Sequence, residues 1–338
     1  MNLVLIDCGS SISAQSIEIG LELGFTSLIT YANERIAQDC RSLGMKWMPI
    51  LPQYLRSQFA GRDELAFRNA AGVSNFSSVK TQLPDKPGCC WPSFWCSDVA
   101  EMVRGQFAQA AEFAGGRLDG AVVSTSVGEC IFPTYWYGHP EATKMCTSYW
   151  CHDPWAIAAW QAQYGNDSLP AARPEDDEDN RTLQFCQDAL IGRLNELAEM
   201  AAEYSDTVCP LLMPYGYSWS HLHRAAGYSG IEARLENWRQ SFLAKHPIEL
   251  AFPFTSVYLG GPAQIAYAAG LCDPAGLGWP CWVGAETGAE VGEQKWQNNL
   301  LVNGRRSKQA GFTGLICSSK YITHPEIQSV VKGILQAL

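Results

Sequence analysis

The feature that most constrains the fold is a regular alternation of short apolar runs with segments of helical spacing. Eight such pairs follow one another along the chain. Because parallel neighbours in a sheet need a crossover connection, usually a helix, this alternation predicts a parallel sheet. The predicted strands are residues 3–7, 26–31, 46–51, 120–125, 207–213, 249–254, 280–285 and 312–317, and the predicted helices are 13–23, 34–43, 98–114, 180–204, 231–245, 263–269, 293–309 and 325–335.

Eight strand–helix units predict the α/β class and, within it, a single (β/α)8 TIM barrel. The 338 residues are compatible with one such domain over 1–338, because barrels with insertions exceed 250 residues. An open, doubly wound sheet is the alternative. It is disfavoured because Cys8-Gly9-Ser10-Ser11 follows the first strand, where a dinucleotide-binding sheet carries G-x-G-x-x-G.

Long connections follow predicted strands, whereas the connections that follow helices are short. The three longest lie near 52–96, 130–179 and 214–230. In a TIM barrel the connections after strands gather at the C-terminal face, where active sites are built. The sequence therefore predicts long loops, and a functional site, on that face.

The composition of the chain bears on its binding partners and on the cellular compartment in which we expect it. The net charge of −10 argues against nucleic acid, and no apolar run is long enough to suggest a membrane partner. The start MNLVLID lacks the basic and long apolar parts of a signal peptide. The 13 cysteines are an odd number, and Cys89 adjoins Cys90, which is not typical of a secreted disulfide framework. We therefore expect a cytoplasmic protein with reduced thiols. Oligomeric state is not indicated.

Two carboxylates follow predicted strands four and seven. Glu129 comes shortly after strand four, just ahead of the aromatic stretch 132–137, and Glu286 directly follows strand seven. A pair of carboxylates flanking a sugar ring is what cleavage of a glycosidic bond requires, and apolar surroundings keep one of them protonated. We predict Glu129 as acid/base and Glu286 as nucleophile. Glu290 is the alternative to Glu286, because the strand end is uncertain by several residues, and either glutamate taken alone also suits a structural pair with arginine.

Aromatic residues are abundant, with 12 Trp and 13 Tyr, and many lie outside the predicted strands. Their flat apolar faces and polar edges suit a binding cleft, while packing of the long loops explains them equally well. The predicted substrate-binding residues are Trp95, Trp136, Tyr137, Trp150, Tyr258 and Trp282, together with Asp7 at the end of the first strand.

This layout resembles clan A of the glycoside hydrolases, whose barrels carry the acid/base after strand four and the nucleophile at strand seven. DPWAIAAWQAQYGN (153–166) resembles the short W-x3-Y-G helix of family 42 β-galactosidases, and 181–201 resembles their next long helix. VGECIFPTY (127–135) is similar to family 14 β-amylases. The resemblance implies a glycosidase barrel, in which Tyr258 stands for the tyrosine that bonds the nucleophile.

The chain departs from the clan pattern at three places. Gly128 stands where the clan has an asparagine before the acid, and Tyr31, with Arg35 slightly later, stands where it has an arginine. Ser318, Ser319, Lys320 and Tyr321 stand where a tryptophan follows strand eight. A retaining glycoside hydrolase acting on a small carbohydrate remains the leading interpretation. The alternatives are an inverting enzyme and a catalytically silent sugar-binding barrel.

No cofactor and no metal are predicted. The resemblance to family 42 implies a structural zinc as an alternative. Cys89, Cys90, Cys96 and Cys130 lie in facing loops, and Cys146, Cys151 and His152 lie close together in sequence. The C-x4-C spacing of Cys146 and Cys151 is not that of a standard zinc knuckle, and buried thiols account for the cysteines equally well. A metal-dependent lyase or isomerase is disfavoured by the low count of 6 histidines.

Overall fold

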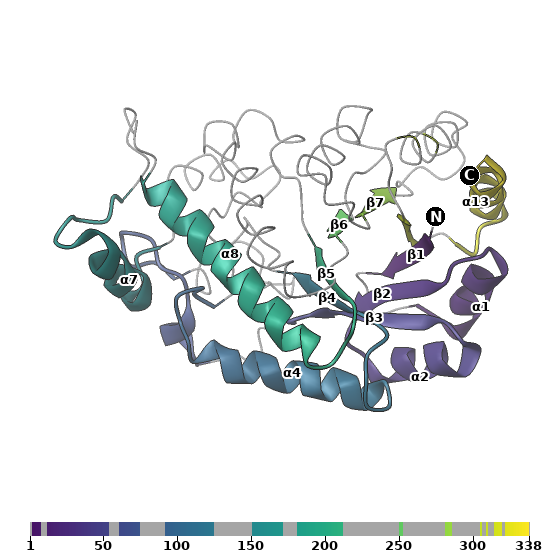
Figure 1. Ribbon diagram of the computed structural model, residues 1–338, viewed down its shortest axis with the longest axis horizontal. Coiled ribbons are helices and arrows are strands. Elements are labelled where there is room, and N and C mark those ends of the chain that lie inside the picture. Colours follow the sequence, from purple (N-terminus) through teal and green to yellow (C-terminus); the bar gives the residue numbers. More distant parts are fainter. Residues whose placement is uncertain are drawn as a thin grey trace.

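The computed structural model of the protein describes residues 2–7, 12–53, 61–74, 92–124, 151–171, 181–211, 250–252, 281–285, 305, 309, 314–319 and 322–337. Within these residues, parallel strands β1 to β8 pair in chain order, and β8 pairs back with β1 to close a barrel (Figure 1). The predicted (β/α)8 architecture of the sheet is thereby confirmed, and an open sheet is excluded.

Each observed strand overlaps its predicted run and differs from it by at most two residues at either end. The strands are β1 (Asn2–Asp7), β2 (Ser27–Tyr31), β3 (Lys46–Leu51), β4 (Ala121–Ser124), β5 (Val208–Leu211), β6 (Leu250–Phe252), β7 (Cys281–Ala285) and β8 (Gly314–Ser318). The bond between Leu51 and Pro52, directly after β3, is cis.

Alternation along the strands divides the apolar residues into two cores. One lies inside the barrel and consists of Val4, Ile6, Ile29, Met48, Ile50, Val122, Cys209 and Ile316. The register brings these residues side by side, since Ile6 pairs with Ile29 and Ile29 with Met48. The residues between them, such as Leu5, Leu28 and Trp47, belong to the larger core beneath the helices.

The described helices are α1 (Ala14–Glu22), α2 (Glu34–Leu43), α4 (Val99–Phe113), α7 (Pro154–Tyr164), α8 (Arg181–Ala202) and α13 (Pro325–Ala337), with a short 3-10 turn η2 (Asp63–Leu65). Ser13 and Asn33 cap α1 and α2 through side-chain oxygens, and α2 ends at Gly44, whose φ is +81°. Of the other predicted helices, 231–245 and 263–269 lie outside the described residues, as does 293–309 except for residues 305 and 309.

In the described part of the chain, no helix has both the length and the apolar composition needed to cross a membrane.

Helix α1 lies close against the sheet at Gly20. A Cβ atom at this position would stand 2.6 Å from Cδ1 of Leu5, which is wholly buried on β1. Gly105 on α4 differs, because a Cβ there would meet nothing within 4 Å. Substituting alanine for each glycine therefore compares two effects. At Gly105 only the backbone entropy changes, whereas at Gly20 the packing changes as well.

We expect Gly105→Ala to raise the free energy of unfolding by about 0.5–1 kcal/mol, because alanine favours the helix. Gly20→Ala should instead lower it by about 1–3 kcal/mol, because the added methyl group overpacks the contact with Leu5. Urea unfolding of both variants measures the difference. Equal changes in the two variants would show that α1 does not press on β1 at this point.

Candidate active site

The carboxyl ends of all eight strands share one rim of the barrel, because every pairing is parallel. Glu286 is the residue after the end of β7, and Glu129 follows the end of β4 by a few residues. Both lie outside the described residues, and so do Trp136, Tyr137, Trp150 and Tyr258. Their predicted roles stay predictions. The backbone of Trp282 lies on β7, in register with Ala251 of β6 and Gly314 of β8.

Two described polar side chains, those of Asp7 and Tyr31, end strands at this rim. Asp7, half-buried, has the same parity on β1 as Leu3 and Leu5, which belong to the core beneath the helices. A substrate contact in the barrel mouth therefore requires its carboxylate to reach around the end of the strand. Tyr31 lies on the other face of the sheet, with the parity of the barrel interior. It is half-buried, ends β2 opposite Ile50, and packs against the interior core. Tyr31 is thus a candidate site residue, although from the sequence alone it is only a departure from the clan pattern.

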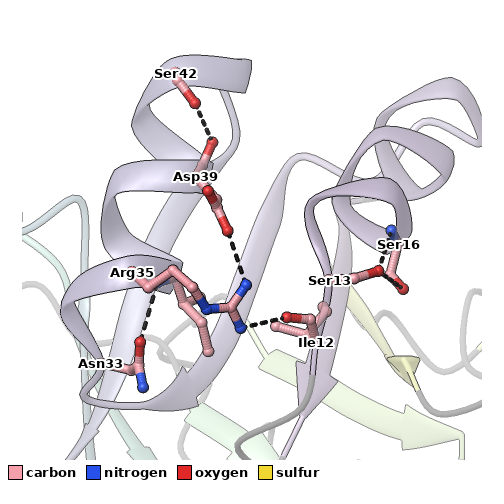
Figure 2. Close-up of polar contacts among 8 residues, drawn as sticks. Ile12, Ser13, Ser16, Asn33, Arg35, Asp39 and Ser42 are labelled. Carbon is pink, nitrogen blue, oxygen red and sulfur yellow. Dashed lines mark hydrogen bonds and ion pairs between the residues drawn. The ribbon is translucent and has the colours of Figure 1, made fainter.

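The first two strand–helix connections at this rim are joined by Arg35 (Figure 2). Its Nη2 atom donates to the carbonyl oxygen of Ile12 at 2.8 Å, and its Nη1 atom pairs with Oδ2 of Asp39 at 3.2 Å. Arg35 therefore braces the N-termini of α1 and α2 against each other. Its guanidinium is used in this structural contact, although the clan pattern suggested a substrate-binding arginine near this position.

Beside the barrel, the side lobe, as we term it, consists of residues 61–74, 92–98, 151–171 and 181–193, with α7 at its outer end (Figure 1). Ser93 Oγ donates to Asp153 Oδ1 at 3.0 Å, and the same oxygen accepts the Ala156 amide and caps α7. The backbone amide of His152 donates to the carbonyl oxygen of Arg68 at 2.8 Å. These bonds join three segments that are distant in sequence.

Asp153 is wholly buried. Burial raises the pKa of its carboxyl group above the ordinary value, against the hydrogen bonds that it accepts from Ala156 and Ser93. Its second oxygen, Oδ2, is buried without a hydrogen-bond partner among the described residues. Burial thus makes the charged carboxylate less favourable than it is in water, and the hydrogen bonds of Oδ1 make Asp153 a structural cap of α7.

Arg193 holds the same turn from the other side. Its side chain is buried on α8, and Nη2 donates to the carbonyl oxygens of Phe94 and Cys96 at 2.9 and 3.0 Å. Nη1 forms an ion pair with Glu196 on the same helix. The turn at 93–96 is thus fixed at both ends, by Asp153 and by Arg193.

Trp95 lies on this fixed turn. Its ring stacks on Phe185 with centroids 4.9 Å apart and planes at 16°, and meets Phe67 edge-on at 6.1 Å. Phe185 in turn meets Trp160 edge-on at 5.2 Å. One face of Trp95 is therefore occupied by packing within the side lobe. The residue as a whole is half-buried, and its contact with a substrate stays a prediction.

Within the described ranges, no three or more His, Cys, Asp or Glu side chains are grouped so as to hold a metal ion. Of the residues considered for zinc, Cys96, Cys151 and His152 are described, whereas Cys89, Cys90, Cys130 and Cys146 lie outside the described residues. The described geometry therefore assigns no metal ligands.

Comparison with protein-family models finds no match, and comparison with curated protein sequences finds none either. Among solved structures, orotidine 5'-phosphate decarboxylase from Pyrococcus horikoshii OT3 is 10% identical, with a TM-score of 0.44 over 99% of this chain and 98% of that one. A psychrophilic glycoside hydrolase family 10 endo-β-1,4-xylanase is 10% identical, with a TM-score of 0.49 over 94% and 85%. Dispersin B is 10% identical, with a TM-score of 0.46 over 99% and 97%.

These proteins include a decarboxylase and a glycoside hydrolase by their names. With TM-scores below 0.5, the similarities do not discriminate among activities. The strand topology by itself defines the chain as a closed, parallel α/β barrel.

We expect Arg193→Met to lower the free energy of unfolding by about 2–4 kcal/mol, because two buried carbonyl oxygens lose their donor. The matched control is Arg181→Met on the same helix. The side chain of Arg181 is 49% exposed and pairs with Asp167, so its loss should cost less than about 1 kcal/mol. Urea unfolding followed by tryptophan fluorescence measures both. A loss of less than about 1 kcal/mol in Arg193→Met would contradict the bracing role.

Proposed function

We propose that the protein is a glycoside hydrolase that cleaves O-glycosidic bonds with Glu129 as acid/base and Glu286 as nucleophile. The observation that carries the proposal is the position of these carboxylates after β4 and β7 of one closed parallel barrel. The carboxyl ends of these two strands share a rim, which is the face on which TIM barrels build active sites.

The register of β7 supports Glu286 over Glu290. Gly284 pairs with Ile316, whose side chain lies in the barrel interior. Successive residues of a strand alternate between its faces, so the position two residues after Gly284 has the interior parity. Glu286 occupies that position in the sequence. Glu290 is five residues past the last paired residue of β7, Ala285, so the strand pairing gives no orientation for it.

The proposed reaction has two displacements at the anomeric carbon. Glu129, protonated, gives its proton to the glycosidic oxygen as the bond from that oxygen to the anomeric carbon breaks, while Glu286 attacks this carbon from the opposite face. Glu129 then takes a proton from water, and the water oxygen displaces Glu286. In an inverting variant, Glu286 would instead activate the water directly, with the carboxyl groups about 6.5–9.5 Å apart rather than about 5 Å.

The proposed substrate is a small oligosaccharide or glycoside, and no cofactor takes part. Trp95, Trp136, Tyr137, Trp150, Tyr258, Trp282 and Asp7 are the proposed binding residues. Tyr31 is added to them because it packs against the interior core at the end of β2. A phenol at this place offers a hydroxyl donor and acceptor to a sugar hydroxyl group.

A catalytically silent sugar-binding barrel is the second candidate. It is favoured by Gly128 in place of the clan's asparagine, and by Ser318 and its neighbours in place of the clan's tryptophan. The retained pair of carboxylates favours the enzyme.

The test is hydrolysis of a panel of activated aryl glycosides and unmodified disaccharides by wild type, Glu129→Ala and Glu286→Ala. We expect Glu286→Ala to lose activity on every substrate by about 10³-fold or more, because no covalent intermediate forms. Glu129→Ala should lose activity mainly on disaccharides, since an activated aryl group needs little proton donation to leave. Glu290→Ala is the matched control and should remain active.

NMR of the first product anomer identifies the stereochemistry. An inverted product would reassign Glu286 as a general base. Full activity of Glu286→Ala with loss in Glu290→Ala would transfer the role to Glu290. A wild-type protein that binds sugars without hydrolysing any member of the panel would favour the silent barrel.

A further inference from the structure

Two buried side chains form a hydrogen-bonded relay directly behind the rim residue Tyr31. Nε1 of Trp47 on β3 donates to Oγ1 of Thr30 on β2 at 2.9 Å, and Thr30 is wholly buried. The hydroxyl group of Thr30 in turn donates to the carbonyl oxygen of Tyr31, also at 2.9 Å. An indole can only donate and a hydroxyl group has one proton, so the bond from Trp47 leaves that proton for Tyr31. We term Trp47 and Thr30 the relay.

The relay acts at the rim end of β2, where the strand leaves the sheet. Within the described residues, β2 pairs with β1 as far as Thr30 and with β3 as far as Tyr31, which lies opposite Ile50. Two residues after Tyr31, Asn33 caps α2 by accepting a hydrogen bond from the Ile36 amide at 3.2 Å. The backbone of Tyr31 is therefore held between the relay and the start of α2.

The relay and the phenol ring lie on opposite faces of the sheet. Trp47 belongs to the core beneath the helices, whereas Ile29 and Tyr31 belong to or pack against the core inside the barrel. Because strand residues alternate between faces, Thr30 points away from the interior, between these two neighbours. Removing the relay therefore deletes no group from the barrel mouth. Its effect on a ligand must pass through the backbone of Tyr31.

We propose that Thr30 and Trp47 are positioning residues of the sugar site, which fix Tyr31 through its carbonyl oxygen so that its phenol binds a carbohydrate hydroxyl group. This inference rests on the proposed function, in which Tyr31 contacts the substrate. A side chain that is held in its binding orientation loses less freedom when the ligand arrives. Because the relay touches neither of the proposed catalytic glutamates, it strengthens binding of the substrate without speeding the chemical step.

The main variant for the test is Thr30→Val, which preserves the shape of the side chain and removes its hydroxyl group. Thr30→Ser retains the hydroxyl group and is the conservative rescue. Trp47→Phe removes the indole donor and leaves Thr30 in place, so it tests the relay independently if Thr30→Val folds poorly.

Thr26→Val is the matched control on the same segment. Thr26 directly precedes β2, at the end of the barrel opposite the rim, and its hydroxyl group donates to the carbonyl oxygen of Leu3 at 3.4 Å. That oxygen also accepts the Thr26 amide at 3.0 Å, so it keeps a donor when the hydroxyl group is removed. The control thus repeats the chemical change of Thr30→Val far from the mouth.

The first measurement is the kinetics of disaccharide hydrolysis. We expect Thr30→Val to raise KM by about 3–10-fold, the range of one ordinary hydrogen bond, and to change kcat by less than about twofold. Trp47→Phe should also raise KM, whereas Thr30→Ser and Thr26→Val should stay within about twofold of wild type. In a Tyr31→Phe background, Thr30→Val should leave KM unchanged, because the hydroxyl group that the relay positions is absent. For a protein that binds sugars without hydrolysing them, Kd replaces KM in each comparison.

The second measurement needs neither a ligand nor activity. The protein is labelled with fluorotyrosine, and the fluorine NMR resonance of Tyr31 is assigned by its loss in Tyr31→Phe. We expect Thr30→Val and Trp47→Phe to shift or broaden this resonance, because the ring is no longer held in one environment. Thr30→Ser and Thr26→Val should leave it in place.

An unchanged Tyr31 resonance in both Thr30→Val and Trp47→Phe would overturn the proposal, whatever the activity. An equal rise in KM with and without the Tyr31 hydroxyl group would also overturn it, as would a fall in kcat at constant KM. Failure of the proposed function gives a different result. A wild-type protein that neither hydrolyses nor binds any sugar, with the resonance still moved by Thr30→Val, would overturn the glycosidase and support the fixing of Tyr31 by the relay.

Discussion

Backbone pairing between β1 and β8 closes the sheet. Closure leaves the first and last strands without an unpaired edge, and it gives the parallel strands a common rim for their carboxyl ends. Closure also makes successive residues of a strand face the barrel interior and the helices in turn. The interior therefore holds residues of one parity only, such as Val4, Ile29 and Ile316. The placement of Tyr31 at the mouth and of Asp7 on the helix-facing side both follow from that parity. So does the support for Glu286 in the proposed catalytic pair.

A second constraint acts beside the barrel, where charged side chains are buried in the side lobe. Arg193 is accommodated because its guanidinium donates to two carbonyl oxygens and pairs with Glu196. Asp153 is accommodated because it accepts hydrogen bonds from Ser93 and from the Ala156 amide at the start of α7. Each side chain satisfies backbone groups that a turn cannot satisfy by itself. Together they make one turn of the long connection after β3 an ordered part of the protein.

The barrel could be predicted from the sequence because its signals are local. Strand β3 was predicted with its observed bounds, since apolar residues run directly to Pro52, which stops the strand. The side lobe could not be predicted in the same way. Its turn at 93–96 depends on Arg193, which lies 97 and 99 positions away from the residues it binds, and no periodic pattern marks such a contact. Composition likewise fitted Trp95 both as a binding-cleft residue and as a residue that packs a loop. Only its stacking on Phe185 shows that one face of the ring is used in packing. Tyr31 carried a usable signal, because it shares the parity of Ile29.

Helix α8 has 22 residues and is therefore about 33 Å long. Its C-terminal part packs against β4, β5 and α4, whereas residues 181–193 carry the stacking and hydrogen bonds of the side lobe (Figure 1). One continuous rod of hydrogen-bonded backbone thus runs through both regions. A lobe built on such a rod cannot swing as a separate body at α8 without breaking the helix. Slow hydrogen exchange should accordingly extend along the middle of α8 across both regions. Within the side lobe, we expect the backbone amides of α7 to exchange faster than those of α8.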